Sequence, residues 1–349
     1  MAGQGRRFAR ALDFRNGRVQ MSHGGGGRAM AQLVEELFLA AFDNELLRRM
    51  DDSACFVPPP GRLATACDSH VVSPLFFPGG DIGSLAVHGT INDVAMAGAR
   101  PMNLSAGFIL EEGFPLADLR RIVRSMAAAA ADAGVPVVAG DTKVVEQGKA
   151  DGVFITTTGI GVVPEGIHIG GDRARPGDRV LISGTLGDHG VAILSKRENL
   201  AFETTLESDT AALHTLVAAM LDAAPQMHCL RDPTRGGLGT ALNELAWQSG
   251  VGMRIREEAL PVREPVKGAC ELLGFDPLYV ANEGKLVAIC PPEAADSVLA
   301  VMRKHPLGRD AADIGEVVAD SERFVVMDTV FGGSRVVDWL SGEQLPRIC

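Results

Sequence analysis

Residues 138–143 read Val-Ala-Gly-Asp-Thr-Lys, an apolar run that leads directly into three polar side chains. The apolar run predicts a buried strand, and the glycine before the polar residues is typical of a turn at a strand end. Asp141, Thr142 and Lys143 would then place a carboxylate, a hydroxyl and an ammonium group on one loop. A Mg²⁺–triphosphate is bound by such groups, so the stretch predicts a phosphate site that follows a strand.

Helix and strand patterns alternate on both sides of this stretch. Apolar residues at helical spacing predict helices over residues 28–42, 82–97, 117–133, 210–223, 237–248 and 293–304. Short β-rich runs predict strands over residues 71–77, 104–110, 135–139, 153–160, 179–183, 252–256, 286–290, 313–318 and 323–327. Residues 184–190 repeat the strand-to-loop pattern, as a second binding loop or as a structural turn, and for His189 we favour the turn.

The chain has 349 residues, which is too long for one ordinary core and suits two domains. Helices mixed with hairpin-like strands predict the α+β class for both. We expect a disordered leader at residues 1–21, an N-terminal domain at 22–170, a C-terminal domain at 171–333 and a mobile tail at 334–349. Fully extended, such a tail would reach roughly 50 Å.

Composition excludes several classes of function. The formal net charge is −11, so nucleic acid is not an expected partner, because phosphate backbones require clustered Lys and Arg. No apolar stretch approaches the roughly 20 residues that span a bilayer, so we expect no membrane segment. The chain has 6 cysteines without C-x-x-C spacing, which argues against zinc and disulfides and indicates a reducing cytoplasm.

Acidic residues beside small residues recur along the chain. We expect each to lie at a strand end or a helix start, in the set Asp51–Asp52, Asp68, Asp93, Asp141 and Asp232. Mg²⁺ uses one or two carboxylates together with substrate phosphates and water. A nucleotide site can therefore use dispersed acids without a dense motif.

A glycine-rich run, Ser-His-Gly-Gly-Gly-Gly at 22–27, precedes the first predicted helix. Glycines let backbone N–H groups approach an anion, and the helix N-terminus adds a positive dipole end. No proper strand precedes the run, so it is not a dinucleotide fingerprint, and the chain contains no G-x-x-x-x-G-K-[ST] motif. From the residues alone, an ATP-site loop and a flexible linker remain equally open.

Together these segments resemble the PurM-like superfamily of ATP-using synthetases and, within it, the HypE family of hydrogenase-maturation proteins. The resemblance covers about residues 21–349, with signposts at 23–27, 51–54, 92–95, 140–144, 187–190, 231–237, 282–285 and the terminal Pro-Arg-Ile-Cys at 346–349. The terminal motif is the most specific of these. The chain departs from the family pattern in its 21-residue leader, in Cys67 and His70 around Asp68, and in Pro233 after Asp232.

The resemblance implies a two-domain PurM-like fold and a chemistry. The thiol of Cys349 would receive a carbamoyl group from the carbamoyltransferase HypF. ATP would then activate the carbamoyl oxygen, dehydration would leave a protein thiocyanate, and the cyanide would pass to iron on a HypC–HypD scaffold. Glu283 would act as the base, and Lys143 would stabilise charge on oxygen.

The resemblance also implies ligand sets and an assembly. ATP would be bound by Gly25, Gly26, Asn92, Asp141, Thr142 and Lys143. Mg²⁺ would be bound by Asp52, Asp68, Asp93, Asp141 and Asp232. The family builds its ATP sites near a homodimer interface, so we expect a dimer.

Three alternatives remain open at this point. A selenophosphate synthetase would carry a reactive cysteine beside the N-terminal glycine loop, where this chain has His23 and glycines. A thiamine-monophosphate kinase would leave the terminal cysteine without a role. A nucleotide-binding scaffold that only presents its tail would bind ATP without turnover.

Overall fold

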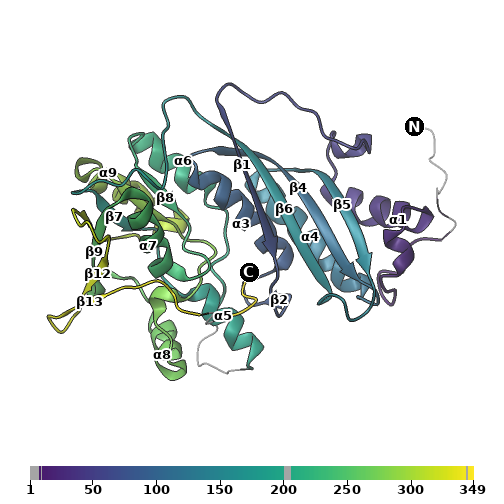
Figure 1. The fold of residues 1–349 in the computed structure, drawn as a ribbon. Coiled ribbons are helices and arrows are strands. Elements are labelled where there is room, and N and C mark those ends of the chain that lie inside the picture. The colour runs from purple at the N-terminus through teal and green to yellow at the C-terminus, as the bar shows by residue number, and fades with distance from the viewer. Residues whose placement is uncertain (1–7, 9, 200–205, 343–344) are drawn as a thin grey trace.

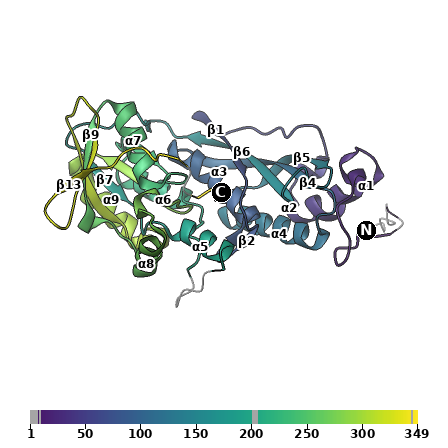
Figure 2. The same ribbon diagram turned by 60° about the horizontal axis from the view of Figure 1, so that its bottom comes forward.

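Two β-sheets form the two halves of the molecule, and the C-terminus lies between them (Figure 1). The computed structural model describes residues 8, 10–199, 206–342 and 345–349. A turned view shows the same arrangement, with the N-terminal helix at the end far from the second sheet (Figure 2). No helix among these residues is long and apolar enough to cross a membrane.

The first sheet has 4 strands in the order β1-β6-β4-β5. Their bounds are β1 Arg62–His70, β4 Arg100–Glu111, β5 Val137–Val145 and β6 Val153–Val163. The β4–β5 pair is parallel and the other two pairs are antiparallel. One face of this sheet is covered by the helices α1 Arg28–Leu33, α2 Ala40–Phe42, α3 Ile82–Met96 and α4 Leu116–Ala133.

The opposite face of this sheet carries exposed side chains, including Leu63 (63% exposed) and Ile109 (42% exposed). Between α1 and α2 the chain stays helical with π geometry over Val34–Leu39, so the predicted helix over 28–42 is present as one helical segment. A two-stranded piece, β2 Phe76–Phe77 and β3 Gly80–Asp81, leads into α3. Asp81 caps α3 by accepting from the N–H groups of Gly83 and Ser84.

The second sheet has 7 strands in the order β13-β12-β9-β11-β7-β10-β8. Their bounds are β7 Arg179–Ile182, β8 Cys229–Arg231, β9 Gly252–Arg256, β10 Val287–Cys290, β11 Ala312–Val318, β12 Val325–Asp328 and β13 Ser334–Val336. Two helices, α6 His214–Ala223 and α9 Pro292–Lys304, share a core with one face, and α7 Gly237–Ser249 shares a core with the other. The first of these cores also contains Val94 and Ala95 of α3, which joins the two halves.

Three predictions about local structure are wrong. The strand predicted at 71–77 is largely a connection, because Pro74 cannot donate to a ladder, and the sheet strand is the preceding β1, whose small residues gave a weak signal. Asp141 to Lys143 lie inside β5 instead of on a turn, because pairing with β4 continues to Val145. The turn favoured for His189 is the first turn of α5 Asp188–Arg197.

The leader prediction is wrong for the part that the structure describes. Residues 1–7 and 9 lie outside the described residues. Val19 is buried and pairs its N–H with the carbonyl of Phe114, while Leu12 and Phe14 pack against the N-terminal core. These three apolar side chains anchor residues 10–21 against the domain.

Candidate active site

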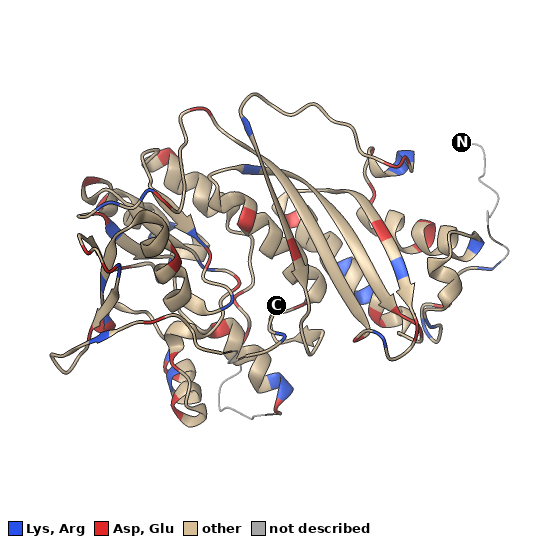
Figure 3. Cartoon of the chain, in the orientation of Figure 1, with Lys and Arg blue, Asp and Glu red and all other residues tan. Residues whose placement is uncertain are grey.

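Four carboxylates from four elements influence one another where the two halves meet. Asp68 is on the edge strand β1, Asp93 on α3, Asp232 directly after β8, and Glu283 in the loop before β10. Figure 3 shows acidic positions on α3 and β1 close to the C-terminus.

Burial and neighbouring acids raise the pKa values of three of these carboxyl groups, Asp93, Asp232 and Glu283. The pKa of Asp93 rises to about 7, through burial first and then the charges of Asp232 and Asp68. Burial likewise raises the pKa of Asp232 to about 6. Burial, followed by Asp232, Asp209, Asp68 and Asp93, raises the pKa of Glu283 well above its usual value. Raised carboxyl pKa values in a cleft are typical of catalytic or cation-binding sites.

Glu283 is held by its own backbone while its side chain stays available. Its N–H donates to Oδ1 of Asp209 at 3.0 Å, and Asn92 Nδ2 donates to its carbonyl at 3.2 Å. The side chain is only 4% exposed, and its Oε1 has no hydrogen-bond partner among the described residues. A buried carboxyl oxygen without a partner is costly, which indicates a position reserved for a reacting group.

Asp209 is the support that sequence analysis missed. Its Oδ2 accepts from Lys285 Nζ at 2.8 Å, and both side chains are almost completely buried. Burial alone would raise the pKa of Asp209, but the charge of Lys285 and the hydrogen bonds from Lys285 and the Glu283 N–H oppose it, and the pKa is lowered. No motif indicated this residue, because it lies 74 positions from Glu283 in the sequence.

The chain's last residue reaches this acidic group. Cys349 O accepts from Val71 N at 2.9 Å, beside the end of β1. Burial, followed by the charge of Glu283, raises the pKa of the Cys349 thiol, and Arg235 partly opposes the shift. Arg235 lines one cavity with Cys349 and Ile348, and a second cavity with Asp93 and Asp232. The 231–237 signpost contained this arginine, but sequence analysis gave it no role.

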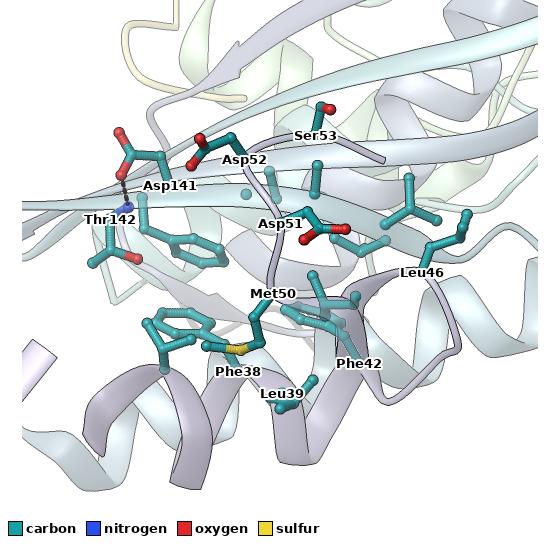
Figure 4. A pocket seen from close by; sticks show the side chains of 18 of the residues that line it. Phe38, Leu39, Phe42, Leu46, Met50, Asp51, Asp52, Ser53, Asp141 and Thr142 are labelled. Carbon is teal, nitrogen blue, oxygen red and sulfur yellow. Dashed lines mark hydrogen bonds between the residues drawn. The ribbon is translucent and has the colours of Figure 1, made fainter. Parts of the chain in front are cut away.

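A second cluster lies around the edge strand β5. An apolar pocket there is lined by Phe38, Leu39 and Phe42 from the 28–42 helical segment, and the carboxylates of Asp52 and Asp141 stand at its rim (Figure 4). Lys143 Nζ pairs with Asp141 at 2.8 Å and lowers the pKa of that carboxyl.

The glycine run borders this second cluster. A Cβ on Gly24 would meet the backbone N of Val144 at 2.7 Å, so only glycine lets the loop approach β5 this closely. Gly26 has φ of +73°, and no atom lies within 4 Å of a Cβ placed there. Gly24 thus lies against Val144, the residue after Lys143 in β5, and Gly25 and Gly26 lead from there toward α1.

The five acids proposed for Mg²⁺ do not converge in one chain. Asp68 and Asp141 lie on opposite edges of the first sheet, and the register places them on opposite faces. The structure brings Asp68, Asp93 and Asp232 together, and Asp52 and Asp141 separately. Across the described residues, no group of three or more His, Cys, Asp or Glu side chains is arranged to hold a metal ion.

Asn92 does not fit the nucleotide-binding role expected for it. Its Oδ1 accepts from Leu213 N at 2.7 Å, and its Nδ2 donates to the carbonyls of Ala211 and Glu283. The side chain is 2% exposed. These three backbone bonds occupy its amide, so Asn92 links the two halves instead of facing a ligand.

Comparisons with known proteins agree with this architecture. Residues 50–163 match the family "AIR synthase related protein, N-terminal domain", and residues 175–328 match the corresponding C-terminal domain. The carbamoyl dehydratase HypE of Azotobacter vinelandii is 73% identical over 338 residues, which cover 97% of this chain and 99% of that protein.

Solved structures give the same result. A hydrogenase maturation protein HypE in complex with ATP has a TM-score of 0.91 at 52% identity, over 95% of this chain and 99% of that one. HypE from a HypE–HypF complex has a TM-score of 0.78 at 51% identity, over 88% of this chain and 99% of that one.

The fold is that of a two-domain, PurM-like protein related to AIR synthase, which confirms the predicted α+β fold class. Within that class, the chain belongs to the HypE family of hydrogenase-maturation carbamoyl dehydratases.

Proposed function

We propose that this chain dehydrates a carbamoyl group on Cys349 Sγ to a thiocyanate and so supplies cyanide for the iron of a [NiFe]-hydrogenase. The observation that carries the proposal is that the docked Cys349 thiol lies within the electrostatic reach of Glu283, whose buried Oε1 has no partner among the residues described. A thiol is a strong nucleophile and forms a transferable S–C bond. A base next to that bond is what removal of carbamoyl N–H protons requires.

The proposed reaction has a simple balance. Phosphorylation of the carbamoyl oxygen by ATP makes that oxygen a leaving group, and loss of phosphate with both N–H protons leaves S–C≡N. Glu283 takes a proton from nitrogen in this scheme. Its desolvated carboxylate is a strong base, since burial and nearby acids raise its pKa.

Cations at this centre would help Glu283 to ionise. Asp232, Asp68 and Asp93 all raise the pKa of Glu283, so neutralising them would lower it again. We propose that Asp232, Asp68 and Asp93 bind Mg²⁺ together with substrate phosphates. Asp52 and Asp141 would bind Mg²⁺ in the same way at the second cluster. Bound Mg²⁺ supplies charge neutralisation of the triphosphate. The carboxylate and carbonyl oxygens present are the ligand type that Mg²⁺ prefers.

The second cluster suits a nucleotide. Its apolar pocket fits a base, and its rim offers acids, Thr142 and the glycine loop at Gly25 and Gly26. A HypE with 52% identity has been solved with ATP, which supports the same ligand here. Lys143 belongs to this cluster, so within one chain it lies across the sheet from Glu283.

A homodimer would bring a second set of these groups to each site. The first sheet has one face without covering helices, where Leu63 and Ile109 are exposed and Asp141 and Lys143 point outward. We propose that two chains pair through this face. In such a dimer Lys143 would stabilise charge on the carbamoyl oxygen from the neighbouring sheet.

The carbamoyl donor and the cyanide acceptor are proposed to be HypF and a HypC–HypD complex. A HypE from a HypE–HypF complex matches this fold, which supports HypF as a partner. The predicted tail begins too early, because Ser334–Val336 form β13 and pair with β12. To meet these partners, the chain end beyond β13 must leave the docked position, so we propose that it moves between the acidic centre and a partner. All 6 cysteines are free thiols, which suits a reaction in the cytoplasm.

Intact-mass spectrometry tests the proposal directly. Incubation with a carbamoyl donor system and ATP should add one carbamoyl group to Cys349 and then remove one water. ATP turnover without a mass change at Cys349 would favour a kinase or synthetase of another PurM-like type. ATP binding without turnover would favour the scaffold alternative.

A further inference from the structure

The last three residues of the chain are held through their backbone carbonyls. Arg347 O accepts from Ser73 N at 3.1 Å and from Arg197 Nη2 at 2.8 Å, and Cys349 O accepts from Val71 N. The carbonyl between them, Ile348 O, lies 2.8 Å from His189 Nε2. Both ends of α5 therefore hydrogen-bond to the tail, the first turn through His189 and the last turn through Arg197.

The state of His189 follows from its partners. Ile348 O can only accept, so Nε2 carries the proton, and Nδ1 is left to accept from the Ser208 hydroxyl at 2.7 Å. His189 is completely buried, with the ring of Phe77 in edge contact at 5.7 Å. Burial lowers its pKa, which favours this neutral form. Both ring nitrogens are satisfied only while the tail is docked.

The position of this hydrogen bond matters for Cys349. The carbonyl of residue 348 belongs to the peptide unit that joins Ile348 to Cys349, and a planar peptide fixes the direction in which the next Cα lies. The Ile348 side chain is 3% exposed and packs into the N-terminal core, so it sets the depth of the tail. His189 then fixes the rotation of the final peptide, and with it the path of the thiol toward Glu283.

We propose that His189 is a positioning residue that holds Cys349 in the acidic centre and thereby sets the balance between a docked and a released tail. The inference rests on the proposed function, in which the thiol must be docked for dehydration and released for carbamoyl transfer. Weakening the bond should thus have opposite effects on the two half-reactions. A merely structural residue would slow both.

Three full-length variants separate these effects. Phe in H189F keeps the ring but removes donor and acceptor, whereas Gln in H189Q can still donate to Ile348 O and accept from Ser208. H228Q is the matched control, because His228 is also largely buried and has no bond to the tail among the described residues. Its Nδ1 lies 2.7 Å from Asp178 Oδ2.

The first readout is iodoacetamide labelling of Cys349, followed by peptide mass spectrometry in the absence of ATP. Loss of one buried hydrogen bond should make H189F label about tenfold faster than the wild type, with H189Q between them and H228Q unchanged. The second readout is single-turnover thiocyanate formation, which H189F should slow about tenfold at an unchanged KM for ATP.

Equal labelling of H189F and the wild type would overturn the proposal, and so would a parallel slowing of carbamoyl transfer and dehydration. Labelling needs neither ATP nor a carbamoyl donor. If H189F exposes Cys349 while the wild type forms no thiocyanate, the proposed function fails and the tail-positioning role stands.

Discussion

The backbone N–H of Glu283 donates to Oδ1 of Asp209 at 3.0 Å, while the second oxygen of Asp209 pairs with Lys285. Two residues on either side of the same tight loop are thus bound to one buried carboxylate. Gly284 lies between them, and a Cβ there would meet Asp209 O at 1.8 Å. The loop is therefore fixed in shape, and Glu283 is held in the acidic group.

Replacing Glu283 by Gln tests its role as base. Gln keeps the size of the side chain and removes the buried acid, so the fold and ATP binding should be retained. Dehydration should fall by at least about 100-fold, the usual contribution of a positioned general base. Mass spectrometry should then show a carbamoyl adduct on Cys349 that persists. Thiocyanate formation at the wild-type rate would refute the assignment.

Asp232 should make stability depend on pH in a defined direction. Its pKa is raised from 3.8 to about 6, so the folded state holds this proton more tightly than the unfolded state does. The group therefore favours the fold below about pH 4, and this contribution is lost as the pH rises through about 6. Asp93, with a pKa of about 7, acts in the same sense.

Asp232→Asn removes the charge without changing the shape. Without Mg²⁺ or nucleotide, the variant should melt a few degrees above the wild type at pH 8, because the wild type carries a buried charge there. At pH 4.5 the two should melt together. Differential scanning calorimetry of both proteins at the two pH values measures this difference. An equal increase in the melting temperature of Asp232→Asn at both pH values would contradict the buried charge as its cause.

Asn92→Ala distinguishes a structural link from a nucleotide ligand. The substitution leaves Leu213 N and the carbonyls of Ala211 and Glu283 without their partner. Each buried group left unsatisfied costs about 1–3 kcal/mol, so the free energy of unfolding should fall by several kcal/mol. The ATP dissociation constant of the folded fraction should stay within about twofold, measured by calorimetry below the melting range. A large loss of ATP affinity at unchanged stability would restore Asn92 to the nucleotide site.

The sequence analysis named most residues of the acidic group, but it did not predict that the five acids would divide between two places. The acids at 68, 93 and 232, Glu283 and Cys349 were all identified, and the structure brings them together. Asp209 was not identified, and His189 was expected only in a turn, since their roles arise from pairing with residues 74 and 159 positions away. Such long-range contacts leave no local pattern of hydrophobicity or turn chemistry.

The misplaced strand at 71–77 has a local cause. The strand β1 alternates exposed positions with half-buried positions that hold small residues such as Ala64 and Ala66, so its period-2 signal is weak. The more apolar run at 71–77 appears stronger, but it is apolar because it borders the core and the docked tail. At residues 71–77, the hydrophobic pattern therefore predicts burial correctly but secondary structure wrongly.

The Cys349 thiol should titrate late in the isolated protein. Burial and Glu283 raise its pKa in the docked state, compared with about 8.5 for a free thiol. Docking therefore favours the protonated thiol. The docked state becomes less favourable once the pH exceeds the pKa of the released thiol. Site-specific labelling should rise at higher pH than in a short peptide ending in Pro-Arg-Ile-Cys. A thiolate fully formed at neutral pH would contradict this.

The open face of the first sheet should carry the dimer contact. Ile109 lies on that face near the end of β4, directly opposite Lys143 of β5, with 42% of its surface exposed. A charge there would have to be buried without a partner if two such faces meet, so Ile109→Asp should give monomers. Size-exclusion chromatography with light scattering measures this. Leu272 is 73% exposed on α8 Glu264–Leu273, and Leu272→Asp is the matched control that should leave the mass unchanged. If the Ile109 variant keeps the dimer mass, the contact lies on another surface, and Lys143 cannot reach a neighbouring site in the way proposed.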